Sequence, residues 1–160
     1  PIFSDAASAI LISKSTKNKI GPFELGADGS GADALELPTG TNEIVMNGAK
    51  VLTFAMDVVP NNVNKLLKKI KIDKKNIHKF IFHQASKYIL DNINRRLSIE
   101  KNKTFENYGK VGNTISASIP IALKDAYTKR KILVNKNIIV AGYGVGLSWG
   151  SALIKWSKLL

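Results

Sequence analysis

The sequence predicts an α/β domain in which helices pack on a mixed sheet. Short runs of β-branched and apolar residues, typical of buried strands, alternate along the chain with segments whose apolar residues recur every three or four positions, as in amphipathic helices. Such alternation favours helices layered on a sheet that is at least partly parallel. Apolar residues make up 44% of the 160 residues, which is enough for one sizeable core and argues against disorder.

The first quarter of the chain predicts a hairpin and a loop. Residues 6–12 change from small to apolar side chains and are expected to form a strand. A polar turn over 14–19 then leads to residues 20–25, the expected second arm of the hairpin. Residues 26–40 are rich in glycine and acidic side chains, which is typical of an irregular loop. This loop lacks the closing glutamate of a calcium-binding loop, so no metal is expected there.

Two helices and a buried strand are expected next. Asn42 or Asn47 is suited to cap a helix, and Pro60 fits the first turn of a second helix over 61–70. Residues 77–82 are predicted to form a buried strand after a turn at 73–75. The first helix is predicted from apolar positions that share one face: Gly48, Val51, Leu52, Ala55 and Val59.

The remaining half predicts two further helices. Ser86 is suited to cap a helix that runs to Leu97, and residues 101–103 are expected to form a loop. The next helix is expected to begin at Asn113, Thr114 or Ser116, with Pro120 tolerated in its first turns. Its predicted apolar face consists of Ile115, Ile119, Leu123 and Ala126.

Two strands joined by a glycine turn close the chain. Residues 138–141 are predicted to form a buried strand, residues 142–146 a tight turn, and residues 148–156 a final strand. The spacing of the glycines is GxGxG and a strand follows, whereas a dinucleotide-binding loop needs GxGxxG and a helix. A plain hairpin turn without chemistry stays open as an interpretation.

The charge points to an anionic partner. The chain has 24 basic and 12 acidic residues, a net charge of +12, which attracts nucleic acid, phosphorylated cofactors such as coenzyme A, or an acidic carrier protein. Many lysines over 65–79 alternate with apolar residues, as on the solvated face of a helix. The sequence contains no nucleic-acid motif, and no apolar run approaches the length of a membrane span. Neither nucleic acid nor a membrane is therefore expected as a partner.

The absence of cysteine excludes disulfides, thiolate metal sites and a cysteine nucleophile within this chain. With only two histidines and no clustered carboxylates, a metal site is not expected either. The chain begins at Pro1 without a signal-like segment, and we expect a cytoplasmic piece of a longer protein.

Two polar residues stand at strand or glycine junctions that precede a helix. His83 follows the apolar run 80–82, and Asn113 follows Gly112. Ligand-binding groups gather at such junctions in α/β sheets. A neutral imidazole and a carboxamide that donate to one thioester oxygen would stabilise an enolate, and backbone N–H groups of the glycine turn would bind a second oxyanion. A structural role for His83 is the simpler alternative.

Five motifs in the right order resemble the carboxyl-terminal half of the 3-oxoacyl-acyl-carrier-protein synthase III family, within the thiolase-like superfamily. They cover nearly the whole chain. The motifs are FSDAASA at 3–9, MNGAKV at 46–51, HQA at 83–85, GNTISASIP at 112–120, and the glycine turn with WGSAL at 142–153.

This resemblance implies a layered thiolase-like half-domain, with residues 1–40 ending the amino-terminal half and residues 41–160 forming the carboxyl-terminal half. It implies catalytic roles for His83 and Asn113 in a Cys-His-Asn triad whose cysteine lies on the other half. A pantetheine channel is implied at Gly48, Leu52, Ala85 and Ser86, with Tyr143 as its wall and the Val145 backbone as a second oxyanion site.

The implied reaction is a decarboxylative Claisen condensation of an acyl group from acyl-coenzyme A with a malonyl-carrier protein. The implied partners are the acyl carrier protein, the amino-terminal half and, in the complete enzyme, a second copy in a homodimer, with no tightly bound cofactor. The chain departs from the family pattern at Ser4, where glycine is usual, at Ser86, where asparagine is usual, and at Tyr88, where a carrier-binding arginine is common. A non-condensing acyltransferase and a non-catalytic partner that binds the carrier protein therefore stay open.

Overall fold

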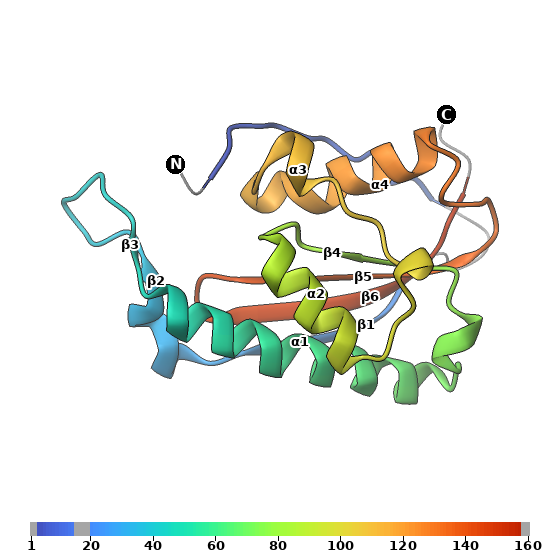
Figure 1. Ribbon diagram of the computed structural model, residues 1–160, viewed down its shortest axis with the longest axis horizontal. Helices are drawn as coiled ribbons and strands as arrows, with labels where there is room; N and C mark the ends of the chain where they lie inside the picture. Colours follow the sequence, from blue (N-terminus) through green and yellow to red (C-terminus); the bar gives the residue numbers. More distant parts are fainter. Residues whose placement is uncertain (1–2, 15–19, 158–160) are drawn as a thin grey trace.

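The computed structural model describes residues 3–14 and 20–157. One four-stranded sheet forms its centre (Figure 1), in the spatial order β1-β6-β5-β4. The strands are β1 (Ile20–Ala27), β4 (Lys79–Phe82), β5 (Asn137–Gly144) and β6 (Ser148–Lys155). Because β4 pairs with β5 in parallel while the other neighbours are antiparallel, the predicted mixed sheet is confirmed. A small second sheet joins β2 (Leu35–Glu36) to β3 (Val45–Met46).

Helices lie on both sides of the sheet (Figure 1). On one side are α1 (Gly48–Ile70) and α2 (Lys87–Arg96); on the other are α3 (Tyr108–Val111) and α4 (Ser118–Thr128). Four short 3-10 segments connect these elements: η1 (Gly29–Ala34), η2 (Lys74–Asn76), η3 (Lys101–Lys103) and η4 (Ile115–Ala117). No helix in the described part of the chain is long and apolar enough to cross a membrane.

Strand β4 shows why two cores form. Its side chains alternate between the sheet faces, as the period of a strand requires. Phe80 and Phe82 pack with apolar residues of α1 and α2, while Ile81 packs with α4. The first core includes Val59, Val63, Leu66, Leu90, Ile93 and Ile139, and the second includes Ala122, Leu123, Ala126, Ile132 and Ile138.

The predicted break at Pro60 is wrong, because α1 continues through this residue. A proline inside a helix removes one backbone hydrogen bond. Here Pro60 is buried, between Val59 and Val63 of the first core, and the packing of this face maintains the helix. Asn47 is confirmed as the amino-terminal cap, since its side chain accepts a hydrogen bond from the Lys50 N–H at 3.0 Å.

The other helix starts are largely as predicted. Ser86 caps α2, accepting from the Ile89 N–H at 3.3 Å, and Pro120 falls in the first turn of α4. Ile115 is the exception. It lies before α4, on η4, and is 53% exposed with a φ of 52°, so it is not part of the apolar helix face. The preceding Asn113 side chain binds the Ile115 N–H and holds this turn.

The predicted hairpin in the first quarter is wrong. Strand β1 pairs with β6, and residues 6–12 form no strand. A strand needs a neighbour for its backbone groups, whereas the ladder contact described for residues 3–14 is a single bridge from Phe3 to Asn113. The apolar side chains of Ile10, Leu11 and Ile12 are accordingly exposed, and the segment runs alongside α3 and α4 (Figure 1). Most of the polar turn expected over 14–19 lies outside the described residues.

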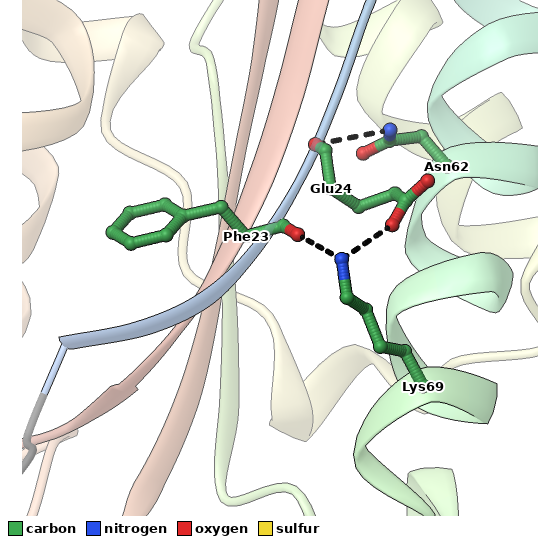
Figure 2. Close-up of polar contacts among 4 residues, drawn as sticks. All are labelled: Phe23, Glu24, Asn62 and Lys69. Atoms are coloured by element: carbon green, nitrogen blue, oxygen red, sulfur yellow. Dashed lines mark hydrogen bonds and ion pairs between the residues drawn. The ribbon is translucent and has the colours of Figure 1, made fainter.

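Helix α1 holds β1 through polar contacts (Figure 2). The Lys69 ammonium donates to the Phe23 carbonyl at 2.8 Å and pairs with the Glu24 carboxylate at 3.2 Å. The Asn62 amide donates to the Glu24 carbonyl at 3.2 Å. Strand β1 thus belongs to the same sheet as β4 to β6, and the domain boundary between residues 40 and 41 stays a prediction. The loop expected over 26–40 contains the end of β1, η1 and β2.

Candidate functional site

His83 lies directly after β4, at the end of the sheet where α2 begins. Its backbone N–H donates to the Ala141 carbonyl of β5 at 2.9 Å, which extends the parallel pairing by one residue. The ring packs edge-on against the Tyr143 ring, with 5.3 Å between centroids. The predicted location of His83 at the carboxyl end of a buried strand is therefore confirmed.

The His83 ring is placed to act as a neutral hydrogen-bonding group. Its Nδ1 lies 2.6 Å from the Ser118 Oγ at the start of α4. Burial lowers the pKa of His83 to about 4, against a smaller opposing effect of a hydrogen bond with the Ile115 backbone. At neutral pH the imidazole is uncharged, so one ring nitrogen donates and the other accepts.

Asn113 is buried and fixed by both its backbone and its side chain. Its carbonyl accepts from the Ser4 N–H at 2.9 Å, and its Oδ1 accepts from the Ile115 N–H at 3.0 Å. The side-chain oxygen being engaged, the amide nitrogen is the end that can donate to a ligand. Gly112 is required beside it, because its φ is +70° and a Cβ there would lie 1.9 Å from the Ser4 Oγ.

His83 and Asn113 share a neighbour in the segment between Asn113 and Ser118. The Asn113 side chain binds the Ile115 N–H, while the backbone of Ile115 lies near the His83 ring. Ser118, three residues further, contacts the ring directly. Both residues therefore contact the segment from Asn113 to Ser118, and their convergence on one ligand stays a prediction.

The glycine turn is shorter than predicted, since β5 continues to Gly144. Two backbone hydrogen bonds with Asp28, at 2.8 and 2.9 Å, hold Leu147 at the end of the turn. Tyr143 contacts His83 and also Phe54 of α1, at 6.2 Å between the latter rings. Burial raises the pKa of Tyr143, and its hydroxyl has no hydrogen-bond partner among the described residues. Val145 lies at the tip of the turn and is 62% exposed.

The four residues of the predicted pantetheine channel lie at the starts of two helices that pack together. Gly48 is the first residue of α1 and is exposed, while Leu52 lies one turn further and is half-buried. Ala85 and Ser86 connect His83 to α2 and are both half-buried. Phe54 links the first turns of α1 to the His83 region through Tyr143.

Two functional-site residues were missed at the sequence level. Ser118 is 1% exposed and contacts the His83 ring, and the sign was a serine within an otherwise apolar helix start. Gln84 is fully buried and connects the end of β4 to the following loop, donating to the Phe82 carbonyl at 2.7 Å and accepting from the Asn107 N–H at 2.9 Å. Across the described residues, no group of three or more His, Cys, Asp or Glu side chains is arranged to hold a metal ion.

Known proteins resemble this chain along most of its length. The chain is 39% identical to the β-ketoacyl-[acyl-carrier-protein] synthase III of Natranaerobius thermophilus, with 97% of this chain and 53% of that protein covered. The enzyme of the same name from Staphylococcus epidermidis is 33% identical over 98% of this chain and 50% of its own length. The chain therefore spans about half the length of these relatives.

Solved structures agree with the fold. The 3-oxoacyl-(acyl carrier protein) synthase III of Pseudomonas aeruginosa superposes with a TM-score of 0.86 at 28% identity, over 92% of this chain and 48% of that one. The Thermus thermophilus enzyme gives 0.85 at 32% identity, over 92% and 50%. The predicted thiolase-like fold is thereby confirmed. The family model described as 3-oxoacyl-[acyl-carrier-protein (ACP)] synthase III C terminal matches residues 67–156, which include His83 and Asn113. The chain belongs to the 3-oxoacyl-[acyl-carrier-protein] synthase III family, through the carboxyl-terminal domain of these proteins.

Proposed function

We propose that this chain supplies the histidine and asparagine of a Cys-His-Asn site for decarboxylative Claisen condensation. The observation that carries the proposal is the neutral, half-buried His83 ring beside the turn that holds the Asn113 carboxamide. The chain has no cysteine, so the acyl-carrying nucleophile lies outside these 160 residues and the chain alone is inactive.

In the proposed reaction, the bond between the malonyl α-carbon and its carboxylate breaks and carbon dioxide leaves. The electron pair moves to the thioester oxygen as an enolate. His83 and Asn113 donate hydrogen bonds to this oxygen without bringing a charge that would have to be neutralised. The α-carbon then attacks the acyl carbonyl on the cysteine, and the thiolate departs.

The substrates proposed are an acyl-coenzyme A thioester and a malonyl group on a phosphopantetheinyl carrier protein, with no tightly bound cofactor. The pantetheine arm is proposed to pass between the starts of α1 and α2, along Gly48, Leu52, Ala85 and Ser86. Tyr143 and the backbone at Val145 would line the far wall and second oxyanion site. The net charge of +12 suits an acidic carrier and a phosphorylated cofactor. We propose a cytoplasmic homodimer for the complete enzyme.

The amino-terminal half of the complete protein is proposed to cover the apolar surface that the chain leaves open. The domain boundary proposed from the sequence lies after residue 40. Since β1 pairs with β6, a boundary before Ile20 suits the sheet better and leaves residues 3–14 as the end of the amino-terminal half. Ile10, Leu11 and Ile12 would then be buried against that half.

The test uses the full-length protein with His83→Ala. We expect malonyl decarboxylation to fall by about 100-fold or more, the size of effect typical of a lost oxyanion donor, while acylation of the cysteine continues. His78→Ala is the matched control, since His78 lies at the opposite end of β4. Unchanged decarboxylation in His83→Ala would contradict the role assigned to this residue.

A non-condensing acyltransferase is a second candidate, favoured by one observation. Tyr88, 61% exposed on α2, stands where the resemblance implies a carrier-binding arginine. Supplying the full-length protein with malonyl-carrier protein and, separately, with amine or alcohol acceptors distinguishes the two. Product formation with the second group alone would favour acyl transfer without condensation, and no product with either would favour a non-catalytic, carrier-binding partner.

A further inference from the structure

Ser118 is buried where α4 meets the His83 ring. Its side chain is almost entirely enclosed, with 1% of the residue exposed, and its Oγ lies 2.6 Å from the His83 Nδ1. Two arrangements fit this distance, since a hydroxyl both donates and accepts. Either Ser118 donates to a bare Nδ1, or it accepts from a protonated Nδ1.

The surroundings of the Ser118 hydroxyl favour donation to the ring. The backbone N–H of Gln84 points at the same Oγ, at 3.5 Å, and supplies it with a proton donor. An Oγ that accepts from Gln84 has its own hydrogen free to point at Nδ1. With Ser118 as the donor to Nδ1, the single proton of the neutral ring lies on Nε2.

We propose that Ser118 is a positioning residue that holds His83 in the tautomer with its proton on Nε2. This inference rests on the proposed function for its catalytic meaning, because a donor Nε2–H is what an enolate oxygen requires from an uncharged imidazole. It goes further in assigning a role to a side chain that contacts the histidine and not the substrate.

His78 provides an internal reference for the proposal. Its Nε2 accepts a hydrogen bond from the Leu133 N–H at 3.2 Å, so this nitrogen is unprotonated. The neutral His78 ring therefore carries its proton on Nδ1. The two histidines of the chain are expected in opposite tautomers, and one spectrum reports both.

The experiment is ¹⁵N NMR of the full-length protein labelled in its histidine imidazoles, with His83→Gln and His78→Gln spectra to assign the two rings. At neutral pH we expect a pyridine-like Nδ1 and a pyrrole-like Nε2 for His83, and the reverse for His78. In Ser118→Ala, the His83 signals should move toward the average of two tautomers. Ser116→Ala, an exposed serine of the same motif, should leave them in place.

Kinetics of the same variants complete the test. Ser118→Ala is expected to lower kcat for decarboxylation by about 10- to 100-fold with little change in KM, as for lost partners that orient functional histidines. A His83 ring protonated on Nδ1 in the unaltered protein, or a tautomer unaffected by Ser118→Ala, would overturn the inference. The tautomer is read without any reaction, so failure of the proposed condensation would leave this result to be judged separately.

Discussion

The two edge strands of the sheet differ in how completely they are covered. All four residues of β4 are buried, because α1 and α2 pack on one face and α4 packs on the other. Along β1, half-buried and exposed residues alternate, with Phe23 50% and Leu25 74% exposed. Helix α1 contacts β1 through Asn62 and Lys69 (Figure 2).

The difference shows which part of the sheet lacks a covering layer. The uncovered face forms an apolar groove of about 190 Å³, with Phe23, Leu25, Ile119, Val140 and Ala152 in its walls. The candidate catalytic residue His83 follows the covered strand, yet Ala141, whose carbonyl binds the His83 N–H, also lines the groove. Relatives twice as long as this chain have further structure available to close such a face.

The largest expected effect contrasts two phenylalanines. Phe80→Ala on β4 should lower the free energy of unfolding by about 3–5 kcal/mol, because it empties a fully buried site. Phe23→Ala on β1 should change it by less than about 0.5 kcal/mol in the 160-residue chain. Denaturant titration measures both. If the groove is covered in the full-length protein, Phe23→Ala should destabilise that protein nearly as much as Phe80→Ala does. An equally small effect of Phe23→Ala in the 160-residue chain and in the full-length protein would contradict the proposed cover.

Burial of His83 next to β4 should also make the stability of the fold depend on pH. The folded pKa of His83, about 4, lies below the unfolded value of about 6.5, so the unfolded chain binds the proton more tightly. Stability is thus full above about pH 6.5 and falls as the pH drops to about 4, by roughly 3 kcal/mol. Denaturant titrations at several pH values across this range should show that the free energy of unfolding depends less steeply on pH in His83→Gln. The lowered pKa of His78, which burial also causes, acts in the same direction and remains in that variant.

Gly112→Ala tests how the amino-terminal segment is held beside Asn113. A new Cβ would meet the Ser4 Oγ, and the φ of +70° strains any residue but glycine, so we expect a loss of about 2 kcal/mol. Adding Ser4→Gly should restore the stability lost to the clash with Ser4, whereas the loss caused by backbone strain at residue 112 should remain. Gly48→Ala, with open space around its Cβ, is the control. Equal stabilities for Gly112→Ala and Gly48→Ala would show that Ser4 does not pack where described.

The smallest effect concerns the polar contacts that hold β1. Lys69→Met keeps most of the side-chain length but removes the donor to Phe23 and Glu24, and we expect a loss of at most about 1 kcal/mol because the pair is partly exposed. Hydrogen exchange should be faster in β1 and unchanged in β4. Lys68→Met, on the exposed side of the same helix turn, is the matched control.

Local signals in the sequence predicted the elements around the candidate site well. The apolar run before His83, the cap at Ser86 and the proline in the first turn of α4 each depend on nearby residues, and all three are as predicted. The parallel pairing of β4 with β5, next to His83, is also in line with the alternation of strands and helices in the sequence.

Predictions failed where distant contacts decide the outcome. Nothing near Pro60 indicates that packing on the sheet would carry α1 through it, and nothing near Ile20 indicates that β6 is its partner. Residues 6–12 have the composition of a strand, but strand formation depends on a neighbour, and the described chain offers only the bridge at Phe3. The Ser118 contact with His83 likewise depends on two elements meeting in space.

The pairing of β1 with β6 has a consequence for synthesis. Ile20 pairs with Ile154, so most of the described chain is synthesised between the two partners. During translation, β1 stays unpaired with Phe23 and Leu25 exposed until β6 has been synthesised. Because closing so long a loop costs entropy before the strands can pair, this pairing is expected to form late. Folding of β1 should therefore depend on β6, and a translation arrest before Ser148 should leave β1 as an aggregation-prone segment.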